Sequence, residues 1–334
     1  MVSLPWRESA SLIIAAGRDP MKILMLQRGA AGSFAKARVF PGGVVESHDF
    51  SERWTHLFRR FFDNIGKASL IPEGAARAPC LVNRPGEIAR EIGMRITAIR
   101  ETFEETGILF AQPASSLLPI KTEVASWRKR VLKDAAHFYD MCDHHSIYPD
   151  VDALAIWSDW LTPIDLSSKR FDTVFFVAEG DDAVQVDVHR DEMDMFEWSS
   201  PLQSLLARME RKVKMAPPQI YELSRLMQFE SAKDLLKFAV ERQKYGCDLT
   251  LPVRVRCSDG IVAIFPGDDS YPAEPDIYGK EPVLTSPKTA EELREGVIRL
   301  HRVESDLRDV ARAFHFNFSL EPQHCDPMPF NAQS

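Results

Sequence analysis

The sequence has few of the features that mark a secreted, disulfide-bonded or membrane-spanning protein. Its 334 residues include five cysteines, which are scattered and form no CxxC pair. This usage is typical of reduced thiols and argues against a structural zinc site built from cysteine pairs. No run of about 18 apolar residues is present, and the start MVSLPWRESASLIIAAGR lacks the pattern of a secretory signal. We expect neither secretion nor a membrane span.

The chain also lacks an excess of positive charge. Its formal net charge is -8 at pH 7, so its overall field does not favour nucleic acid, and we expect no DNA partner. A local basic patch would still suit a phosphorylated small molecule. With 45% hydrophobic and 27% charged residues, the composition is that of a soluble globular protein of one large or two modest domains.

Short apolar runs predict the strands of the first two thirds of the chain. Residues 9–16 and 22–27 flank the turn sequence GRDP and predict a hairpin. Further strands are expected at 108–111, 153–163, 170–179 and on both sides of an acidic loop within 184–199. Gly42 and Gly43 follow a strand-like Val-Phe pair, which suggests backbone packed too closely for a β-carbon.

Helical spacing of apolar residues predicts the helices. One begins near Glu87 and stops at Gly107, a second covers 125–145, and a third is capped by Ser200. From about Val213 two more helices, a hairpin turning at Asp259-Gly260 and a proline-rich loop follow. We therefore expect a main domain at 5–212, with an insertion at about 50–90, and a C-terminal extension at 213–334.

The segment IRETFEETGI, residues 99–108, gathers Glu101, Glu104 and Glu105 on the helix face opposite its apolar stripe. Like charges at this spacing repel one another by a few tenths of a kcal/mol per pair unless a cation neutralises them. Mg²⁺ prefers carboxylate oxygens together with substrate phosphates. Spacing alone nevertheless favours a solvated acidic face over a metal site, and Arg100 with Glu104 would stabilise any exposed helix.

The surrounding residues resemble the Nudix signature. RETFEETGI is similar to its second half, with Thr102 at a position that is usually apolar, and FPGG supplies the glycines of its first half. Asp49 stands where the signature carries a further glutamate, and residues 50–99 replace its short spacer. An insertion is plausible because an exposed loop lengthens at slowly growing entropic cost. With VFPGGVVE, RFDTVFFVA and SDGIVAIFPGD, the chain resembles the branch that includes the peroxisomal coenzyme A diphosphatases of animals.

This resemblance implies an α+β fold, the Nudix α/β/α sandwich with a mixed sheet, and hydrolysis of a nucleoside diphosphate linked to another moiety. It implies Mg²⁺ or Mn²⁺ as the cofactor. Glu104 and Glu105 would be the main metal ligands, Glu101 a further ligand or the base that activates water, and Arg100 the residue that orients the glutamates. A glutamate in the acidic loop, here Glu192, often assists in such folds, although a solvated turn explains it as well.

The sequence does not decide the roles of the basic residues near the expected site. Gly42, Gly43, Arg38 and Arg170 are our candidates for contacts with substrate. Arg28 and Lys36 belong to the same basic loop as Arg38, and surface positions would explain all of these cations equally well.

Coenzyme A or acyl-coenzyme A is the expected substrate, with 3′,5′-ADP and (acyl-)phosphopantetheine as products. One alternative is a pyrophosphatase for ADP-ribose, NADH or a capped RNA end, and another is a Nudix fold kept as a non-catalytic binding module. The expected partner is thus a small nucleoside diphosphate derivative, with RNA only as a cap. The branch suggests peroxisomes, but residues 331–334 are not an SKL-type address, so a cytoplasmic location is expected.

Overall fold

The structure is a computed structural model of the chain, and it describes residues 6–30, 35–62, 71–72, 74–113, 117–166, 169–184, 186–189, 191–308, 311–320 and 324–331. A helix long and apolar enough to cross a membrane is not found in these ranges.

A mixed sheet forms the centre of the molecule. Its order is β11-β3-β2-β1-β9-β8-β13, with β4 paired to β1 and β10 paired to β2. The strands are β1 (Arg7–Ala16), β2 (Lys22–Arg28), β3 (Ala37–Val39), β4 (Gly42–Val44), β8 (Ala155–Leu161), β9 (Phe171–Glu179), β10 (Met193–Ser199), β11 (Lys214–Met215) and β13 (Leu249–Thr250). The predicted β1–β2 hairpin is confirmed, and β1 also pairs in parallel with β9.

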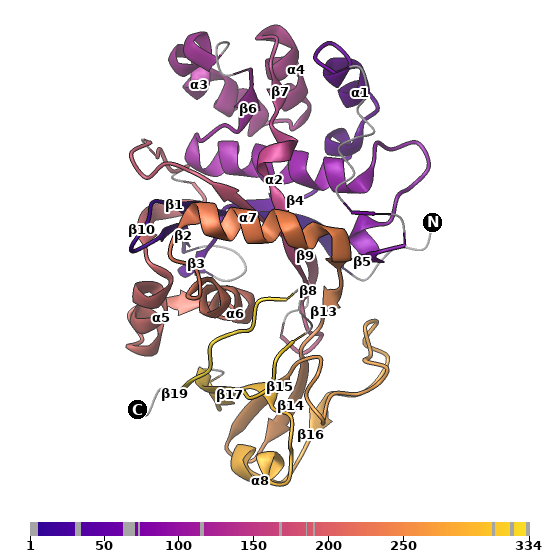
Figure 1. Cartoon of the computed structure of the whole chain (residues 1–334), viewed down its shortest axis with the longest axis vertical. Coiled ribbons are helices and arrows are strands. Elements are labelled where there is room, and N and C mark those ends of the chain that lie inside the picture. The colour runs from indigo at the N-terminus through magenta and orange to yellow at the C-terminus, as the bar shows by residue number, and fades with distance from the viewer. Residues whose placement is uncertain are drawn as a thin grey trace.

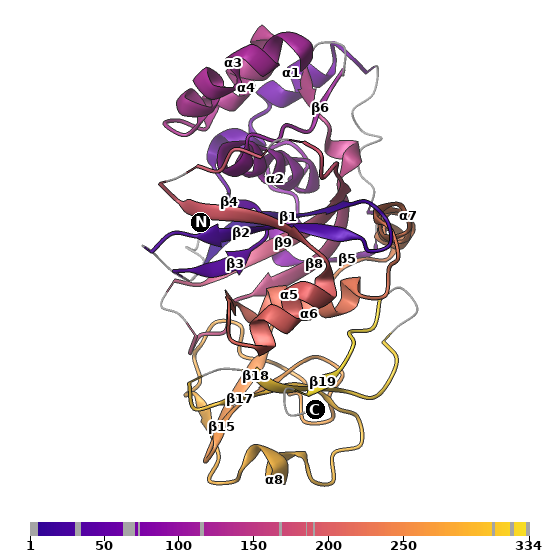
Figure 2. The ribbon, with the colours of Figure 1, turned by 90° about the vertical axis from the view of Figure 1, so that its left-hand side faces the viewer.

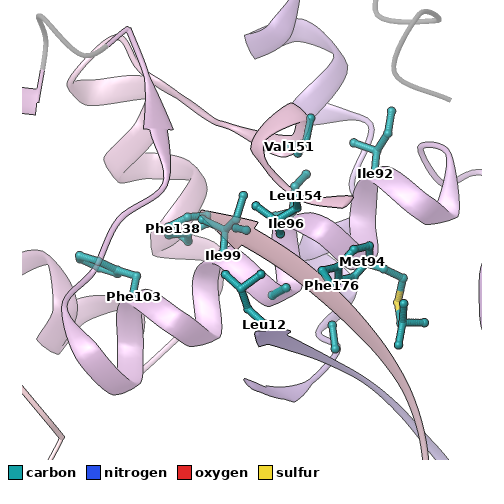
Figure 3. Packing of buried hydrophobic residues seen from close by; sticks show 14 of the residues in the cluster. Leu12, Ile92, Met94, Ile96, Ile99, Phe103, Phe138, Val151, Leu154 and Phe176 are labelled. Atoms are coloured by element: carbon teal, nitrogen blue, oxygen red, sulfur yellow. The ribbon is translucent and has the colours of Figure 1, made fainter. Parts of the chain in front are cut away.

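Helices cover both faces of this sheet, which confirms the predicted sandwich (Figures 1 and 2). On one face lies α2 (Arg90–Thr106), whose Ile96, Ile99 and Phe103 are fully buried with Leu12 of β1 (Figure 3). The other face is covered by α5 (Pro201–Met209), which begins at the predicted cap Ser200, and by α6 (Pro217–Leu226) and α7 (Ala232–Arg242).

Helix α1 (Arg53–Phe58) of the predicted insertion lies in an extra layer beyond α2 (Figure 1). The turn η1 (Ser47–Phe50) leads into the insertion. Its later elements, β5 (Ala76–Arg77) and η3 (Pro79–Leu81), return toward the sheet, since β5 pairs with β12 (Gly246–Cys247) and Cys80 bonds to Asp159 of β8. Parts of the insertion lie outside the described residues. The chain after α2 continues the extra layer through β6 (Ala111–Gln112), α3 (Leu117–Val131), α4 (Ala136–His144), β7 (Tyr148–Pro149) and η5 (Val151–Ala153).

Three element predictions were wrong in detail. The single helix expected at 125–145 is two helices, because Asp134 accepts a hydrogen bond from the N–H of Ala136 at 2.9 Å and so starts α4 anew. The strand expected at 108–111 is reduced to the short β6. The described residues of 184–189 form no strand, because the N–H groups of Asp187 and His189 bond to carbonyls at the end of α2.

The C-terminal part adds a second sheet of order β16-β14-β15-β17-β18-β19. Its elements are β14 (Val253–Cys257), β15 (Gly260–Ile264), β16 (Leu284–Thr285), α8 (Ala290–Arg294), β17 (His301–Asp306), β18 (Ala311–Phe316) and β19 (Phe330–Asn331); η6 (Gln243–Tyr245) and β12 (Gly246–Cys247) precede them. The predicted β14–β15 hairpin is confirmed.

The division of the chain at residue 212 stays a prediction. Helices α6 and α7 follow that position, yet they share one core with the central sheet. Phe265 and Phe314 of the C-terminal part enter the same core, where Phe265 meets Tyr221 of α6 with ring centroids 5.3 Å apart. The helical layer therefore extends to Arg242, and the second sheet packs directly beneath it.

Candidate active site

The end of α2 is held against the sheet, and its carboxylates face the β4 loop. The helix stops at Gly107, which has a left-handed φ of 75° and donates its N–H to Phe103 O. Two residues earlier, Glu105 is 3% exposed, and its Oε2 accepts a hydrogen bond of 2.9 Å from the N–H of Gly42. Burial and the nearby Glu101 raise the pKa of Glu105 well above its usual value.

Arg100 organises the rest of this cluster from a position that is 2% exposed. Its Nε and Nη2 donate to the two oxygens of Asp49 at 2.9 and 2.8 Å. Its Nη1 donates to Glu101 at 2.8 Å and to Glu104 at 2.7 Å. The Thr97 hydroxyl also donates to Asp49 at 2.9 Å, so Asp49 is a buried acceptor that fixes the guanidinium and through it two of the glutamates.

The two glycines of the loop are both required by close contacts. Gly42 has a φ of 152°, and a β-carbon there would lie 2.4 Å from the carbonyl oxygen of Ala10. A β-carbon on Gly43 would lie 2.3 Å from Oε2 of Glu101. The sequence prediction of backbone packed too closely for a side chain is confirmed, and one of the two contacts is with the carboxylate cluster itself.

A cavity of about 390 Å³ opens beside these groups. Its polar end is lined by Arg28, Gly42, Gly43, Glu101, Glu105 and Glu192. Many of its other lining side chains are apolar: Trp160, Leu161, Pro163, Leu166, Phe171 and Phe175 come from the β8–β9 region, and Pro217, Pro218, Pro252 and Ala263 come from α6 and the C-terminal part. Polar side chains are interspersed among them, namely Ser9, Ser11, Thr162, Thr173, Gln219 and Arg254. One pocket thus joins a carboxylate cluster to an apolar arm.

The structure brings most of the predicted site residues together, with two exceptions. Arg38 forms an ion pair of 2.5 Å with Glu197. Arg170 is 4% exposed and donates to the carbonyls of Thr162 and Ile277 at 2.7 and 2.8 Å. Neither is among the residues that line the pocket, and their candidacy for substrate contact stays a prediction.

Two other arginines, Arg28 and Arg254, line the pocket, and Arg254 is paired with Asp165 at 3.0 Å. The Nε of Arg28 is buried and makes no hydrogen bond to any described residue. Of the basic loop identified in the sequence, Lys36 and Arg38 pair with Asp194 and Glu197, whereas Arg28 lines the pocket.

The donor set fits a divalent cation. Burial, opposed by Arg100 and reinforced by Glu104, raises the pKa of Glu101 to about 7. The pKa of Glu104 is raised as well, chiefly by burial. Three carboxylates gathered in a partly desolvated site with one shared arginine leave negative charge that a hard cation would neutralise.

Comparisons with known families agree with this geometry. The family model of the NUDT19 Nudix domain matches residues 6–226, and that of the NUDT19 C-terminal domain matches residues 254–314. The chain belongs to the NUDT19 family of Nudix hydrolases. Nudix hydrolases generally need divalent metal ions, which suits the three glutamates. The matched Nudix domain includes α6, in agreement with its packing on the central sheet.

Relatives of this family align with nearly the whole chain. The acyl-coenzyme A diphosphatase NUDT19 of Gallus gallus is 35% identical over 98% of this chain and 96% of its own length. The protein of the same name from Homo sapiens is 31% identical over 98% of this chain and 95% of its own length. Among solved structures, a Nudix hydrolase from Alicyclobacillus acidocaldarius matches with a TM-score of 0.53 and 20% identity, covering 71% of this chain and 97% of that one, which supports the fold.

Proposed function

We propose that this chain hydrolyses the diphosphate of coenzyme A and acyl-coenzyme A to 3′,5′-ADP and (acyl-)phosphopantetheine. The observation that carries this proposal is the pocket, which joins the carboxylate cluster to an apolar arm. Beyond the diphosphate, acyl-phosphopantetheine carries two amides and one hydroxyl, which suit the scattered polar groups of the lining, and ends in an apolar acyl chain, whereas ADP-ribose and NADH carry sugar hydroxyls on both sides. Such hydroxyls need polar partners when they are buried. The names of the NUDT19 relatives support the same substrate class.

Glu101, Glu104 and Glu105 are proposed to hold Mg²⁺ or Mn²⁺. Such an ion, when bound, neutralises diphosphate charge and lowers the pKa of its water. Arg100 acts as a positioning residue, because its guanidinium is buried and spans Glu101 and Glu104. The Gly42 N–H fixes the third carboxylate by its hydrogen bond to Glu105.

Arg28 is proposed to contact the substrate diphosphate. Its side chain lines the polar end of the pocket, and its charge favours the ionised form of Glu105. A guanidinium next to a phosphate forms short charge-assisted hydrogen bonds, which would satisfy the buried Nε that has no partner within the described residues. Arg28 thus takes the role that the sequence assigned to Arg38 and Arg170.

Glu192 is proposed as the group that accepts the proton of the attacking water, with Glu101 as the second candidate. Glu192 lines the pocket, and its charge raises the pKa values of Glu104 and Glu105, so its carboxylate lies near the cluster. A base in this place needs to reach the water and stay ionised. Glu101 lies in the cluster and could reach the water, but its pKa of about 7 means that it is only partly ionised near neutral pH.

A substrate panel tests the proposal. The purified chain is incubated with Mg²⁺ or Mn²⁺ and, separately, with coenzyme A, a medium-chain acyl-coenzyme A, ADP-ribose, NADH and capped RNA, and products are identified by chromatography and mass spectrometry. We expect 3′,5′-ADP from the first two. Cleavage of ADP-ribose, NADH or capped RNA with coenzyme A left intact would favour the alternative substrates.

Two variants sharpen the panel. Ala263→Leu narrows the pocket at a residue of β15 in the C-terminal part, so kcat/KM should fall for the acyl substrate and change little for free coenzyme A. Glu105→Gln should abolish turnover of both. Unchanged turnover in Glu105→Gln would show that the glutamate assignment is wrong and would favour a non-catalytic binding module.

A further inference from the structure

A second cluster of ligating side chains lies in the interior, outside the pocket lining. It consists of Cys80 on η3, Asp159 on β8 and Asp172 on β9. Their exposed fractions are 0, 0 and 1%. The thiol sulfur and one oxygen of each carboxylate lie within 4.8 Å of one another. Three segments that are distant in the sequence therefore direct a sulfur and two carboxyl groups to one buried point.

The carboxylate oxygens of this cluster accept few hydrogen bonds. The short contact of 2.9 Å between Cys80 Sγ and Asp159 Oδ2 is the hydrogen bond that joins the thiol to the pair. Both oxygens of Asp172 and Oδ1 of Asp159 accept no well-aligned hydrogen bond from the described residues, although the Trp6 indole N–H, which has no hydrogen-bond partner among them either, lies close enough to lower the pKa of Asp172. A buried carboxylate oxygen without a donor is costly, so the site calls for a further positive group.

The neighbouring arginines do not supply that charge. Arg90 donates to the carbonyl of Cys80 through Nε, but its Nη2 pairs with Glu8 at 2.7 Å and its Nη1 with Glu87 at 3.0 Å. Arg84 also pairs with Glu8. The positive charges of Arg84 and Arg90 are thus paired with Glu8 and Glu87, so they do not balance negative charge on the two aspartates.

Burial adds to this imbalance. It raises the pKa of Asp159 well above its usual value, with Asp172 and Glu8 as further causes. It also raises the pKa of Asp172, with Glu8 as a further cause, whereas contacts with Asp159, Cys80 and Trp6 lower it. A cation between the two aspartates would let both carboxyls ionise, and without one the pair keeps a shared proton.

We propose that Cys80, Asp159 and Asp172 bind one divalent transition-metal ion of the zinc class, at a site separate from the catalytic carboxylates. Two positive charges balance the two aspartates, and a sulfur with two carboxylate oxygens is a donor set that Zn²⁺ or Co²⁺ accepts, with a fourth position left for water. The thiol releases its proton to solvent as it coordinates. Because η3 belongs to the insertion and β8 and β9 to the central sheet, the ion ties the insertion to the sheet.

Cobalt provides a direct test, since a thiolate bound to Co²⁺ gives a sulfur-to-metal charge-transfer band in the near ultraviolet that carboxylates cannot give. The full chain is produced in cobalt-supplemented medium, so that the site fills during folding, and is then separated from loose metal by gel filtration with EDTA. We expect about one retained cobalt per chain and a thiolate band. Added Zn²⁺ should remove the band on unfolding and refolding.

Matched variants assign the signal. Cys80→Ser should lose the band, whereas Cys142→Ser, which alters a fully buried thiol of α4, should keep it. Glu105→Gln should keep it too, because that substitution affects only the catalytic cluster. Asp172→Asn should lower the retained cobalt several-fold, and thermal unfolding verifies that each variant folds.

Three results would overturn the proposal. These are wild-type protein that retains no cobalt, retained cobalt without a thiolate band, and a band that survives in Cys80→Ser. If, in addition, Asp172→Asn raised the melting temperature of metal-free protein, a carboxyl pair sharing a proton would replace the metal as the explanation. Because none of these readouts measures turnover, their failure is distinguishable from failure of the proposed diphosphatase.

Discussion

Replacing Gly43 by alanine should disable the site without unfolding the protein. The new β-carbon would lie 2.3 Å from Oε2 of Glu101, whereas ordinary contact begins near 3.4 Å, so the carboxylate must move by about 1 Å. A displacement of that size in a reacting constellation costs roughly 100-fold in rate, or about 2.7 kcal/mol in the activation free energy. The hydrogen bond of 2.8 Å from Arg100 to Glu101 is lost too. Because the Glu101 side chain is 15% exposed, water can replace the lost hydrogen bond. We therefore expect the free energy of unfolding to fall by less than about 1.5 kcal/mol.

The neighbouring Gly42→Ala is the matched control. Its β-carbon would meet backbone, 2.4 Å from Ala10 O and 2.6 Å from the α-carbon of Ser11, at a φ of 152°. Strand β1 cannot yield as a side chain does, so we expect a loss of about 2–5 kcal/mol in unfolding free energy. The assays are kcat on coenzyme A with saturating Mg²⁺ and equilibrium unfolding in urea. The reasoning is refuted if Gly43→Ala keeps more than about a tenth of kcat, or if it destabilises the fold as much as Gly42→Ala does.

Four further predictions concern the same site. Asp49→Asn removes the most buried of the three carboxylates paired with Arg100, while Glu101 and Glu104 remain, and urea unfolding should show a loss of about 1.5–3 kcal/mol; a loss below about 1 kcal/mol, on the order of an exposed pair, would contradict the assigned role. Arg28→Ala should raise KM for coenzyme A by roughly 10–100-fold in steady-state assays, and an unchanged KM would remove Arg28 from the substrate site. The metal dissociation constant, measured by titration calorimetry, should rise about tenfold per pH unit below the pKa of about 7 of Glu101, because protons compete for its carboxylate. The pKa of Glu101 in the folded chain exceeds the value of 4.5 expected in the unfolded chain. Without metal, Glu101 therefore stabilises the folded state fully below pH 4.5, and this stabilisation is lost as the pH rises through about 7. Melting temperatures of metal-free protein measured over a pH series check this.

Local patterns predicted most of the fold because each of these patterns has a local physical cause. The apolar spacing of Ile96, Ile99 and Phe103 gave α2, and Gly107 ended it through a conformation that glycine adopts at low cost. The errors came from hydrogen bonds that periodicity does not reveal. Asp134 breaks the expected long helix with a side-chain bond, and the segment containing Asp187 bonds to the end of α2 instead of to a strand.

The sequence predicted those site residues whose spacing is fixed by a motif. It did not predict contacts between side chains from distant segments. Glu101, Glu104 and Glu105 follow from one helical turn. The choice among the arginines depends on Glu197 for Arg38 and on the carbonyl of Ile277 for Arg170, and neither partner is near in the sequence. The apolar arm likewise needs β8, β9, α6 and the second sheet to come together, which no single stretch of sequence encodes.

The long insertion leaves the Nudix arrangement intact because its two ends meet. The N–H of Ile88 donates to the carbonyl of Phe50 at 3.1 Å, and the Phe50 ring lies against Gly93 of α2, where a β-carbon would come within 2.1 Å of it. The Arg90 guanidinium covers the same ring at 3.8 Å. The short spacer of the signature is therefore restored in space although the chain between Phe50 and Ile88 is long.

The contact between the two ends of the insertion also explains how an aspartate at position 49 can take the place of the longer glutamate. The 3-10 turn η1, which packs on α2, carries the backbone of Asp49 close enough for both carboxylate oxygens to reach Arg100, at 2.8 and 2.9 Å. Any insertion that keeps Phe50 and Ile88 paired preserves this contact. Since each doubling of a flexible loop costs only about 0.6 kcal/mol, the length of the insertion can change greatly while the geometry of the glutamates does not.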